Sequence, residues 1–302
     1  MRDEQARGDL LDRARLFPSG PNVVGATAAE ARAGVDQVAA LGVGVVKTRL
    51  DDRPDDMPPA VYRALIDQAH RRGLRVAAHA VTLDDARGLA DAGVDAIVHS
   101  VRDRDVDAEL IAALTSRDVG YVPTLTRTLS LFLYETTPAF FGDPFFLRGG
   151  DAYRAEMARI REPGLQAQVR AGGQAATARA VLAQARRNLK LLADGGVTIA
   201  MGTDSGTQLG RWQGYFEHVE LELMVAAGLT PMQALVAATG AAARVMGLGD
   251  LGTLEPGNRA DFLVLDADPL ADIRNTRRID SIWIAGRRAF LDGAAPQTPG
   301  EP

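Results

Sequence analysis

The chain has 302 residues and a formal net charge of −5, so neither nucleic acid nor an anionic membrane is an expected partner. Apolar residues make up 46% of the chain, which is enough to bury a large core and argues against global disorder. The absence of cysteine excludes disulfides, thiol catalysis and cysteine-bound zinc, so any metal would need ligands such as His, Asp or Glu.

The N-terminal segment, residues 1–17, is charged and has the pattern of an amphipathic helix, which differs from a secretory signal peptide. No apolar run reaches the length that crosses a bilayer. We therefore expect a cytoplasmic protein without a membrane partner, and the formation of a homo-oligomer remains open.

Short apolar runs alternate with amphipathic helical segments through the first half of the chain. The runs are GVGVVK (42–47), LRVAAHA (74–80), AIVHS (96–100) and VGYVPTLT (119–126). The helical segments between them end at glycines or carry acidic first turns, as helices commonly do. Buried strands that alternate with helices in this way are typical of parallel βαβ units.

The alternation is interrupted over residues 129–192, where an aromatic-rich stretch precedes long helical sequence, and we expect a helical insertion there. It returns with VTIAMGTD (197–204), followed by further helices. Later residues form short alternating runs with Pro-Gly and Ala-Gly turns. The sequence thus predicts an α/β protein, with a TIM-like (β/α) barrel over residues 1–248, a small C-terminal β appendage over 249–292 and a disordered tail over 293–302.

Polar residues close four of the apolar runs: Lys47, His79, His99 and Asp204. Each has an ordinary interpretation, since strand histidines are often hydrogen-bonded core residues, Gly-Thr-Asp turns often cap helices, and strand-end lysines usually reach the surface. In a parallel barrel, however, the carboxyl ends of the strands meet at one mouth. Four polar residues at equivalent positions favour a shared metal-binding site over four separate explanations.

Other polar residues have less specific surroundings. His70 falls near the end of a predicted helix, where a surface position that suits the helix dipole is expected. His218 follows the last predicted barrel strand and either faces the mouth or lies on a helix surface. The neighbouring Glu217, Glu220 and Glu222 are expected to form a solvated helix face.

Three segments together resemble a known family. Residues 73–100, GLRVAAHAVTLDDARGLADAGVDAIVHS, resemble the strand 5 to strand 6 region of metal-dependent amidohydrolases of the imidazolonepropionase and Xaa-Pro dipeptidase group. MGTDSG (201–206) resembles the strand 8 motif of that family, and residues 221–270 are similar to its C-terminal region. The resemblance extends from Gly42 to Arg288 and is weakest in the aromatic insertion.

The resemblance implies a role for each strand-end residue. Lys47 matches a lysine that the family carboxylates to a carbamate bridging two metals, and His79 and His99 match ligands of the second metal. Asp204 matches the aspartate that binds the first metal and shuttles a proton. The implied cofactor is one or two divalent ions, zinc foremost, and the implied reaction is attack of metal-activated water on a small-molecule amide or dipeptide. Arg211 and His218 are our candidates for contacts to a substrate carboxylate.

The sequence departs from the family at its start. The family begins its barrel with an H-x-H strand, and this sequence has no H-x-H, its first histidine being His70. GVGVVK then matches strand 4 and ARLFPSG (14–20) matches strand 3, so strands 1 and 2 are expected to be missing from an incomplete barrel of strands 3–8. Either this is a shortened reading frame of a hydrolase, or it is a catalytically inert homologue that acts as a binding protein. A lysine that forms a Schiff base, as in aldolases, is a third hypothesis.

Overall fold

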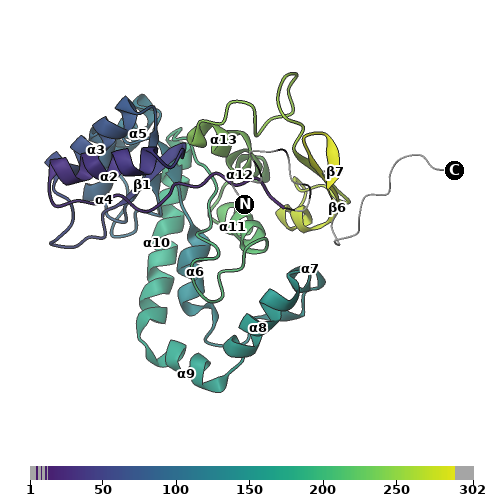
Figure 1. The fold of residues 1–302 in the computed structure, drawn as a ribbon. Helices are drawn as coiled ribbons and strands as arrows, with labels where there is room; N and C mark the ends of the chain where they lie inside the picture. The colour runs from purple at the N-terminus through teal and green to yellow at the C-terminus, as the bar shows by residue number, and fades with distance from the viewer. Residues whose placement is uncertain (1–4, 6–7, 9–10, 12, 290–302) are drawn as a thin grey trace.

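A four-stranded parallel sheet forms the centre of the computed structural model, which describes residues 5, 8, 11 and 13–289. The strands pair in chain order and are β1 (Val45–Arg49), β2 (Arg75–His79), β3 (Ala96–Val98) and β4 (Gly120–Val122). The helices that precede or connect them are α2 (Ala28–Ala39), α3 (Pro59–Arg71), α4 (Leu83–Asp91) and α5 (Ala108–Ser116). Figure 1 shows these helices gathered on one side of the sheet. The predicted parallel βαβ units are confirmed.

Three of these helices, α2, α4 and α5, begin at side chains that satisfy one of their first backbone donors. Thr27, Thr82 and Asp107 each accept a hydrogen bond from the backbone N–H three residues further on. Such caps satisfy donors that have no partner within the helix, and each is worth about 1 kcal/mol. The caps fix where α2, α4 and α5 begin, and these helices, with α3, alternate with the strands as predicted.

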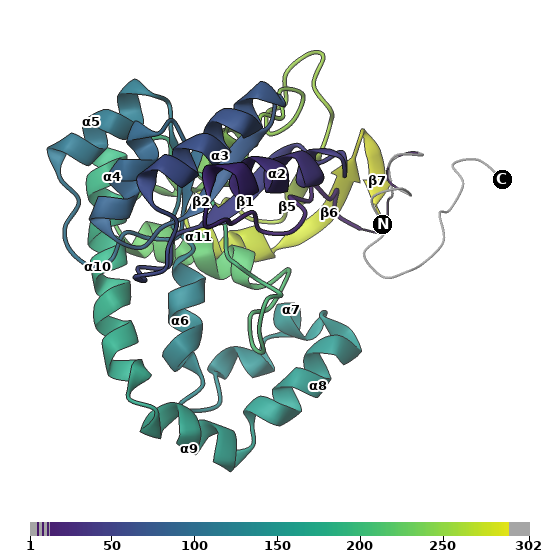
Figure 2. The same ribbon diagram turned by 60° about the vertical axis from the view of Figure 1, so that its left-hand side comes forward.

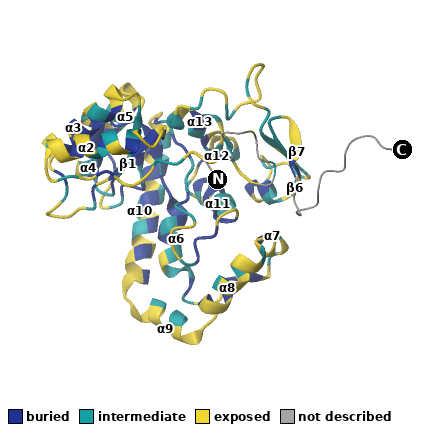
Figure 3. Ribbon diagram, viewed as in Figure 1, coloured by how far each residue is buried: buried dark blue, intermediate teal, exposed yellow. Residues whose placement is uncertain are grey.

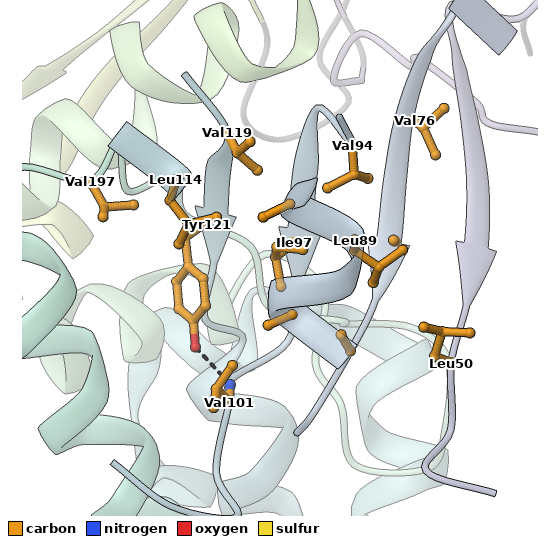
Figure 4. Close-up of a cluster of buried hydrophobic side chains, with 14 of the residues drawn as sticks. Leu50, Val76, Leu89, Val94, Ile97, Val101, Leu114, Val119, Tyr121 and Val197 are labelled. Carbon is orange, nitrogen blue, oxygen red and sulfur yellow. Dashed lines mark hydrogen bonds between the residues drawn. The ribbon is translucent and has the colours of Figure 1, made fainter. Parts of the chain in front are cut away.

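Strand alternation divides the sheet into two faces. Val46, Val76, Ile97 and Tyr121 point toward the helices and are fully buried. Figure 4 shows this layer, with Ile97 and Tyr121 of the sheet beside Leu89 and Leu114 of the helices. The opposite face lines a small internal cavity with Val45, Ala77, Val98 and Val122. Because side chains two residues apart share a face, Lys47 and His79 lie on this inner face.

Tyr121 carries a buried polar contact within this core. Its hydroxyl accepts a hydrogen bond of 2.7 Å from the backbone N–H of Val101 (Figure 4). Tyr121→Phe leaves that donor without a partner in a dry environment, so we expect a loss of about 1–3 kcal/mol in the free energy of unfolding, measured in urea. Tyr153→Phe removes a hydroxyl bonded at an exposed site and is expected to cost clearly less; equal losses would contradict this explanation.

Two further segments flank the sheet. At one edge Val23 donates to the carbonyl of Lys47 over 2.8 Å, so residues 21–24 take the position predicted for residues 14–20. That prediction was wrong because Val23 is buried, whereas Leu16 and Phe17 are exposed. At the other edge Ile199 bridges Tyr121 in parallel, although residues 197–204 form no regular strand. Over the described residues the strand order does not return to β1, so the sheet is open.

The predicted insertion is helical and projects from the sheet as an arm, seen below it in Figures 1 and 2. Its helices are α6 (Leu125–Leu133), η1 (Ala139–Gly142), α7 (Pro144–Leu147), α8 (Gly150–Ile160), α9 (Pro163–Ala171) and α10 (Gln174–Asp194). A second hydrophobic cluster there joins aromatic residues of the insertion, such as Phe146, to Trp212 and Phe216. Figure 3 shows that α8 and α9 are mostly exposed.

The remaining elements complete one side of the molecule. They are the helices α11 (Phe216–Ala226), α12 (Pro231–Ala238) and α13 (Gly240–Met246), then β5 (Phe262–Leu265), η2 (Ile273–Arg277), β6 (Ile279–Ile284) and β7 (Arg287–Ala289). The three strands form a separate antiparallel sheet in the order β5-β6-β7, within the predicted appendage. The predicted boundaries stay predictions, and the tail at 293–302 and most of the helix at 1–17 lie outside the described residues. In the part that is described, no helix could span a membrane.

Candidate metal site at the strand ends

Lys47 supplies a buried amine at the end of β1. Its Nζ atom is buried and has no hydrogen-bond partner among the described residues. Burial lowers the pKa of Lys47 to about 8, while the Asp204 carboxylate acts to raise it and the Arg127 charge to lower it. A buried cation without a bonded partner is costly, so the surroundings favour either a neutral amine or an amine that has been converted to another group.

His79 and His99 lie side by side at the ends of β2 and β3. Their ring centroids are 4.3 Å apart at an interplanar angle of 65°. Burial lowers the pKa of His79 to about 4 and depresses that of His99 further, with the nearby positive charges acting in the same direction. Both rings are therefore neutral near pH 7, which is the form that binds metals.

A hydrogen bond sets the orientation of the His99 ring. Its Nδ1 atom lies 2.8 Å from Oγ1 of Thr124, which follows β4. This contact leaves Nε2 of His99 as the ring nitrogen for another ligand, an arrangement common for metal-binding histidines. His79 has a looser neighbour, since its Nε2 lies 3.7 Å from Oδ1 of Asp51.

Asp204 meets two arginines instead of the histidines. Its Oδ2 atom accepts a hydrogen bond of 2.7 Å from Arg211 and lies 3.2 Å from Nε of Arg127. The Arg211 side chain is only 5% exposed and also donates to Oγ1 of Thr207. Arg211 was predicted to contact a substrate carboxylate, a role that stays a prediction, and the structure directs its guanidinium to Asp204.

The backbone at these strand ends is strained. His99, Thr124 and Asp204 have φ angles of 77°, 46° and 59°, in the left-handed region that residues other than glycine rarely adopt. Such conformations cost on the order of 1–3 kcal/mol each and concentrate at functional sites. Here they turn the chain sharply where three strand-like segments end.

The other two histidines lie elsewhere. His70 is in the last turn of α3, and its ring forms a 2.9 Å contact with Asp95, so the predicted surface position is confirmed. His218 lies on α11, where Nδ1 is 2.9 Å from Oγ1 of Thr276 and the ring packs edge-on against Phe145. Burial lowers the pKa of His218 to about 4. Its predicted contact with a substrate carboxylate stays a prediction.

The prediction of a solvated glutamate face was wrong for Glu220. This side chain is fully buried and accepts hydrogen bonds of 2.7, 2.7 and 2.8 Å from the backbone of Leu125, the backbone of Thr126 and the hydroxyl of Thr126. Burial raises the pKa of Glu220 to about 7, although the three donors act in the opposite direction. Glu220 is buried because α11 packs against α6, α12 and η2.

Two arginines near the site were missed in the sequence. Arg102 and Arg127 both act to lower the pKa values of His79 and His99, so their charges lie close to the imidazole pair. Each follows a strand end within a few residues, Arg102 after His99 and Arg127 after Thr124. Their position after the strands was the signal that could have identified them.

The donors present fit a metal only in part. Within the described residues, no group of three or more His, Asp and Glu side chains is arranged to hold a metal ion. The strand ends instead combine two neutral imidazoles with the orphaned Lys47 amine, and the Asp204 carboxylate lies close enough to Lys47 to affect its pKa. An amine converted to an anionic oxygen donor would supply the third ligand that the imidazole pair lacks.

Comparison with known protein families identifies the class of protein. The family model of the amidohydrolase family matches residues 14–289, and the chain belongs to that family. This confirms the resemblance seen in the sequence, and it leaves the Schiff-base hypothesis for Lys47 without support.

Three similar proteins show which members of the family the chain resembles. A Bifidobacterium longum protein solved as a candidate prolidase is 28% identical, with a TM-score of 0.74 over 98% of this chain and 70% of that chain. Imidazolonepropionase of Deinococcus deserti is 40% identical over 101 residues, 32% of this chain and 25% of that protein. An uncharacterized Mycobacterium bovis protein is 28% identical over 84% of this chain and 60% of its own length. The chain thus spans less than two thirds of these two curated relatives.

Proposed function

We propose that this chain belongs to a metal-dependent hydrolase that cleaves amide or peptide-like C–N bonds in small molecules. The observation that carries the proposal is the buried, unpartnered amine of Lys47 on the same sheet face as His79, whose ring lies beside that of His99. Membership of the amidohydrolase family supports the reaction class. The relatives include an imidazolonepropionase and a candidate prolidase, and both names are consistent with C–N bond hydrolysis.

His79, His99 and a carboxylated Lys47 would hold the ion, which we expect to be zinc or a similar divalent metal. Neutral imidazoles and an anionic oxygen are ligands that zinc accepts. The bound ion would supply Lewis acidity and lower the pKa of water to ~7. Thr124 keeps the His99 ring in place through Nδ1, so the other nitrogen stays directed away from that contact.

Asp204 is the residue we propose for proton transfer. Both arginine contacts reach its Oδ2 atom, and Oδ1 has no bonded partner in the described part of the chain. Oδ1 is therefore the oxygen that would accept a proton from water and return it to the leaving nitrogen. The two arginine contacts hold the carboxylate in place through Oδ2 and leave Oδ1 for this exchange.

Metal content tests the proposal. Mass spectrometry on the purified chain, supplied with zinc and bicarbonate, is expected to find about one ion per chain, since His79, His99 and Lys47 make up one ligand set. His79→Ala is expected to lose the ion because only one imidazole remains.

His70→Ala is the matched control, since it removes an exposed histidine that pairs with Asp95 outside the site. It is expected to keep the metal. A folded wild-type chain without metal, as judged by circular dichroism, would overturn the hydrolase proposal for this chain and favour the inert binding protein.

A further inference from the structure

An open cavity of about 450 Å³ adjoins the strand-end site. It lies between the loop after β3, helix α6 and the start of α10, and its polar lining includes Arg102, Arg127, Thr128, Gln174 and Thr177. The described residues that line it include no aspartate and no glutamate. The wall of the cavity is therefore positively charged.

Among the described residues, Arg102 has no partner of opposite charge. No carboxylate in the described part of the chain pairs with its guanidinium, although most neighbouring arginines form ion pairs. Burial lowers the pKa of Arg102 to about 10, and the positive charge of Arg127 contributes to that shift. The group remains a cation at neutral pH, so two guanidinium groups face one cavity, and in the described part of the chain only that of Arg127 pairs with a carboxylate, Asp204.

The start of α10 adds further donors to the cavity. This 21-residue helix begins after Gly173 without a side-chain cap, so backbone N–H groups of its first turn are left for another partner. Gln174 and Thr177 of that turn line the cavity. Helix starts attract anions, which adds to the attraction of the two arginines.

The cavity is connected to the proposed metal ligands through Arg127. Its Nε lies 3.2 Å from Oδ2 of Asp204, and the charges of Arg102 and Arg127 both reach His79 and His99. A group bound in the cavity would thus lie beside the centre where hydrolysis is proposed. Arg211 is directed to Asp204, so it contributes little to this wall.

We propose that this cavity binds a carboxylate of the substrate, with Arg102 as its main contact. Resting on the proposed function, this assigns the substrate class as amides that carry a free carboxylate, such as N-acyl amino acids or dipeptides, in preference to neutral amides. The carboxylate would anchor the substrate with its amide bond toward the strand ends.

The test uses metal-free protein, so that neither coordination to a metal nor hydrolysis contributes. In a ligand-observed NMR titration N-acetylglycine is expected to bind, whereas its neutral counterpart N-acetylglycinamide is not. Arg102→Gln is expected to weaken binding of the acid at least about tenfold, because it removes a charge-assisted contact. Gln174→Glu is also expected to weaken binding of the acid, because it places a negative charge at the cavity. Glutamate is favoured in the first turn of a helix, so α10 is expected to keep its start.

Arg104→Gln is the matched control. Arg104 lies in the same loop, its side chain is 50% exposed, and it pairs with Asp84, so its loss is expected to leave acid binding unchanged. Equal binding of acid and amide, or acid binding unaffected by both Arg102→Gln and Gln174→Glu in folded protein, would overturn the proposal. If the chain binds the acid but cannot take up metal, the carboxylate-binding cavity is supported and the hydrolase proposal is rejected. If the chain takes up metal but does not bind the acid, the hydrolase proposal stands and the carboxylate-binding cavity is rejected.

Discussion

Lys47→Met is expected to abolish carbamate formation on this protein, whereas Lys190→Arg is expected to leave it intact. The chain has only these two lysines, so the pair forms an internal comparison. The measurement is ¹³C NMR of the chain equilibrated with ¹³C-bicarbonate and zinc. One carbamate resonance is expected for the wild type and for Lys190→Arg, and none for Lys47→Met.

The surroundings of the two amines explain the difference. Nζ of Lys47 is buried without a hydrogen-bond partner, whereas Lys190 lies at the surface and pairs with Asp194. An ammonium group that pairs with a carboxylate in water is already stabilised, so it gains little from conversion to a carbamate. A buried amine beside two neutral imidazoles gains a stabilising partner when it becomes an anionic ligand to a metal that they share.

The Lys47→Met variant is expected to fold. Methionine matches the length of the lysine stem and removes a buried polar atom that had no partner, so Lys47→Met is expected to unfold at an equal or higher urea concentration. A carbamate resonance that persists in folded Lys47→Met would contradict the assignment of Lys47 as the carboxylated metal ligand.

The strand alternation of the sequence was enough to predict much of the candidate site. Residues two apart share a face of a strand, and parallel strands end at the same edge, so Lys47 and His79 were expected to meet at one end of the sheet. Four runs became β1–β4 because each is short, apolar and followed by a helix, and two of these helices, α4 and α5, begin at a side-chain cap. These are local properties that a sequence displays directly.

The edges of the sheet were harder to predict because they depend on competition between neighbouring segments. Residues 21–24 bury Val23 beside β1, although residues 14–20 have a similar apolar content. Residues 197–204 carry a clear strand pattern but pair with β4 only around Ile199. An outer segment forms a regular strand only when another segment pairs with it or its own ladder is long enough, and neither condition is visible in its local pattern.

The other features that the sequence did not predict depend on contacts between residues that are distant in the chain. Glu220 meets Leu125 across 95 positions of sequence, so its pattern of alternating charge looks like an exposed helix face until the helices are packed together. Arg102 and Arg127 likewise become candidate site residues only when the loop after β3 and helix α6 are seen to line the same cavity. Charge alone does not separate a surface arginine from one that lines a site.

Glu220→Ala is expected to lower the free energy of unfolding by about 3 kcal/mol or more. The substitution leaves the backbone N–H groups of Leu125 and Thr126 without their acceptor in a buried place, whereas the Thr126 hydroxyl can still donate to the carbonyl of Thr203, and each buried unsatisfied donor costs roughly 1–3 kcal/mol. The loss is increased because these N–H groups begin α6, where a carboxylate also meets the positive end of the helix dipole. Urea unfolding followed by circular dichroism measures the change.

Glu109→Ala is the control, since its side chain is 76% exposed in a surface pair with Arg87 and its loss should cost no more than ~1 kcal/mol. A similar small loss for Glu220→Ala would show that water replaces the carboxylate at the start of α6. The expected effect also reaches the metal site, because Thr124, whose hydroxyl holds the His99 ring, directly precedes the two residues that Glu220 anchors. Metal affinity should therefore fall in Glu220→Ala under conditions where the protein is still folded, although Glu220 is not a proposed ligand.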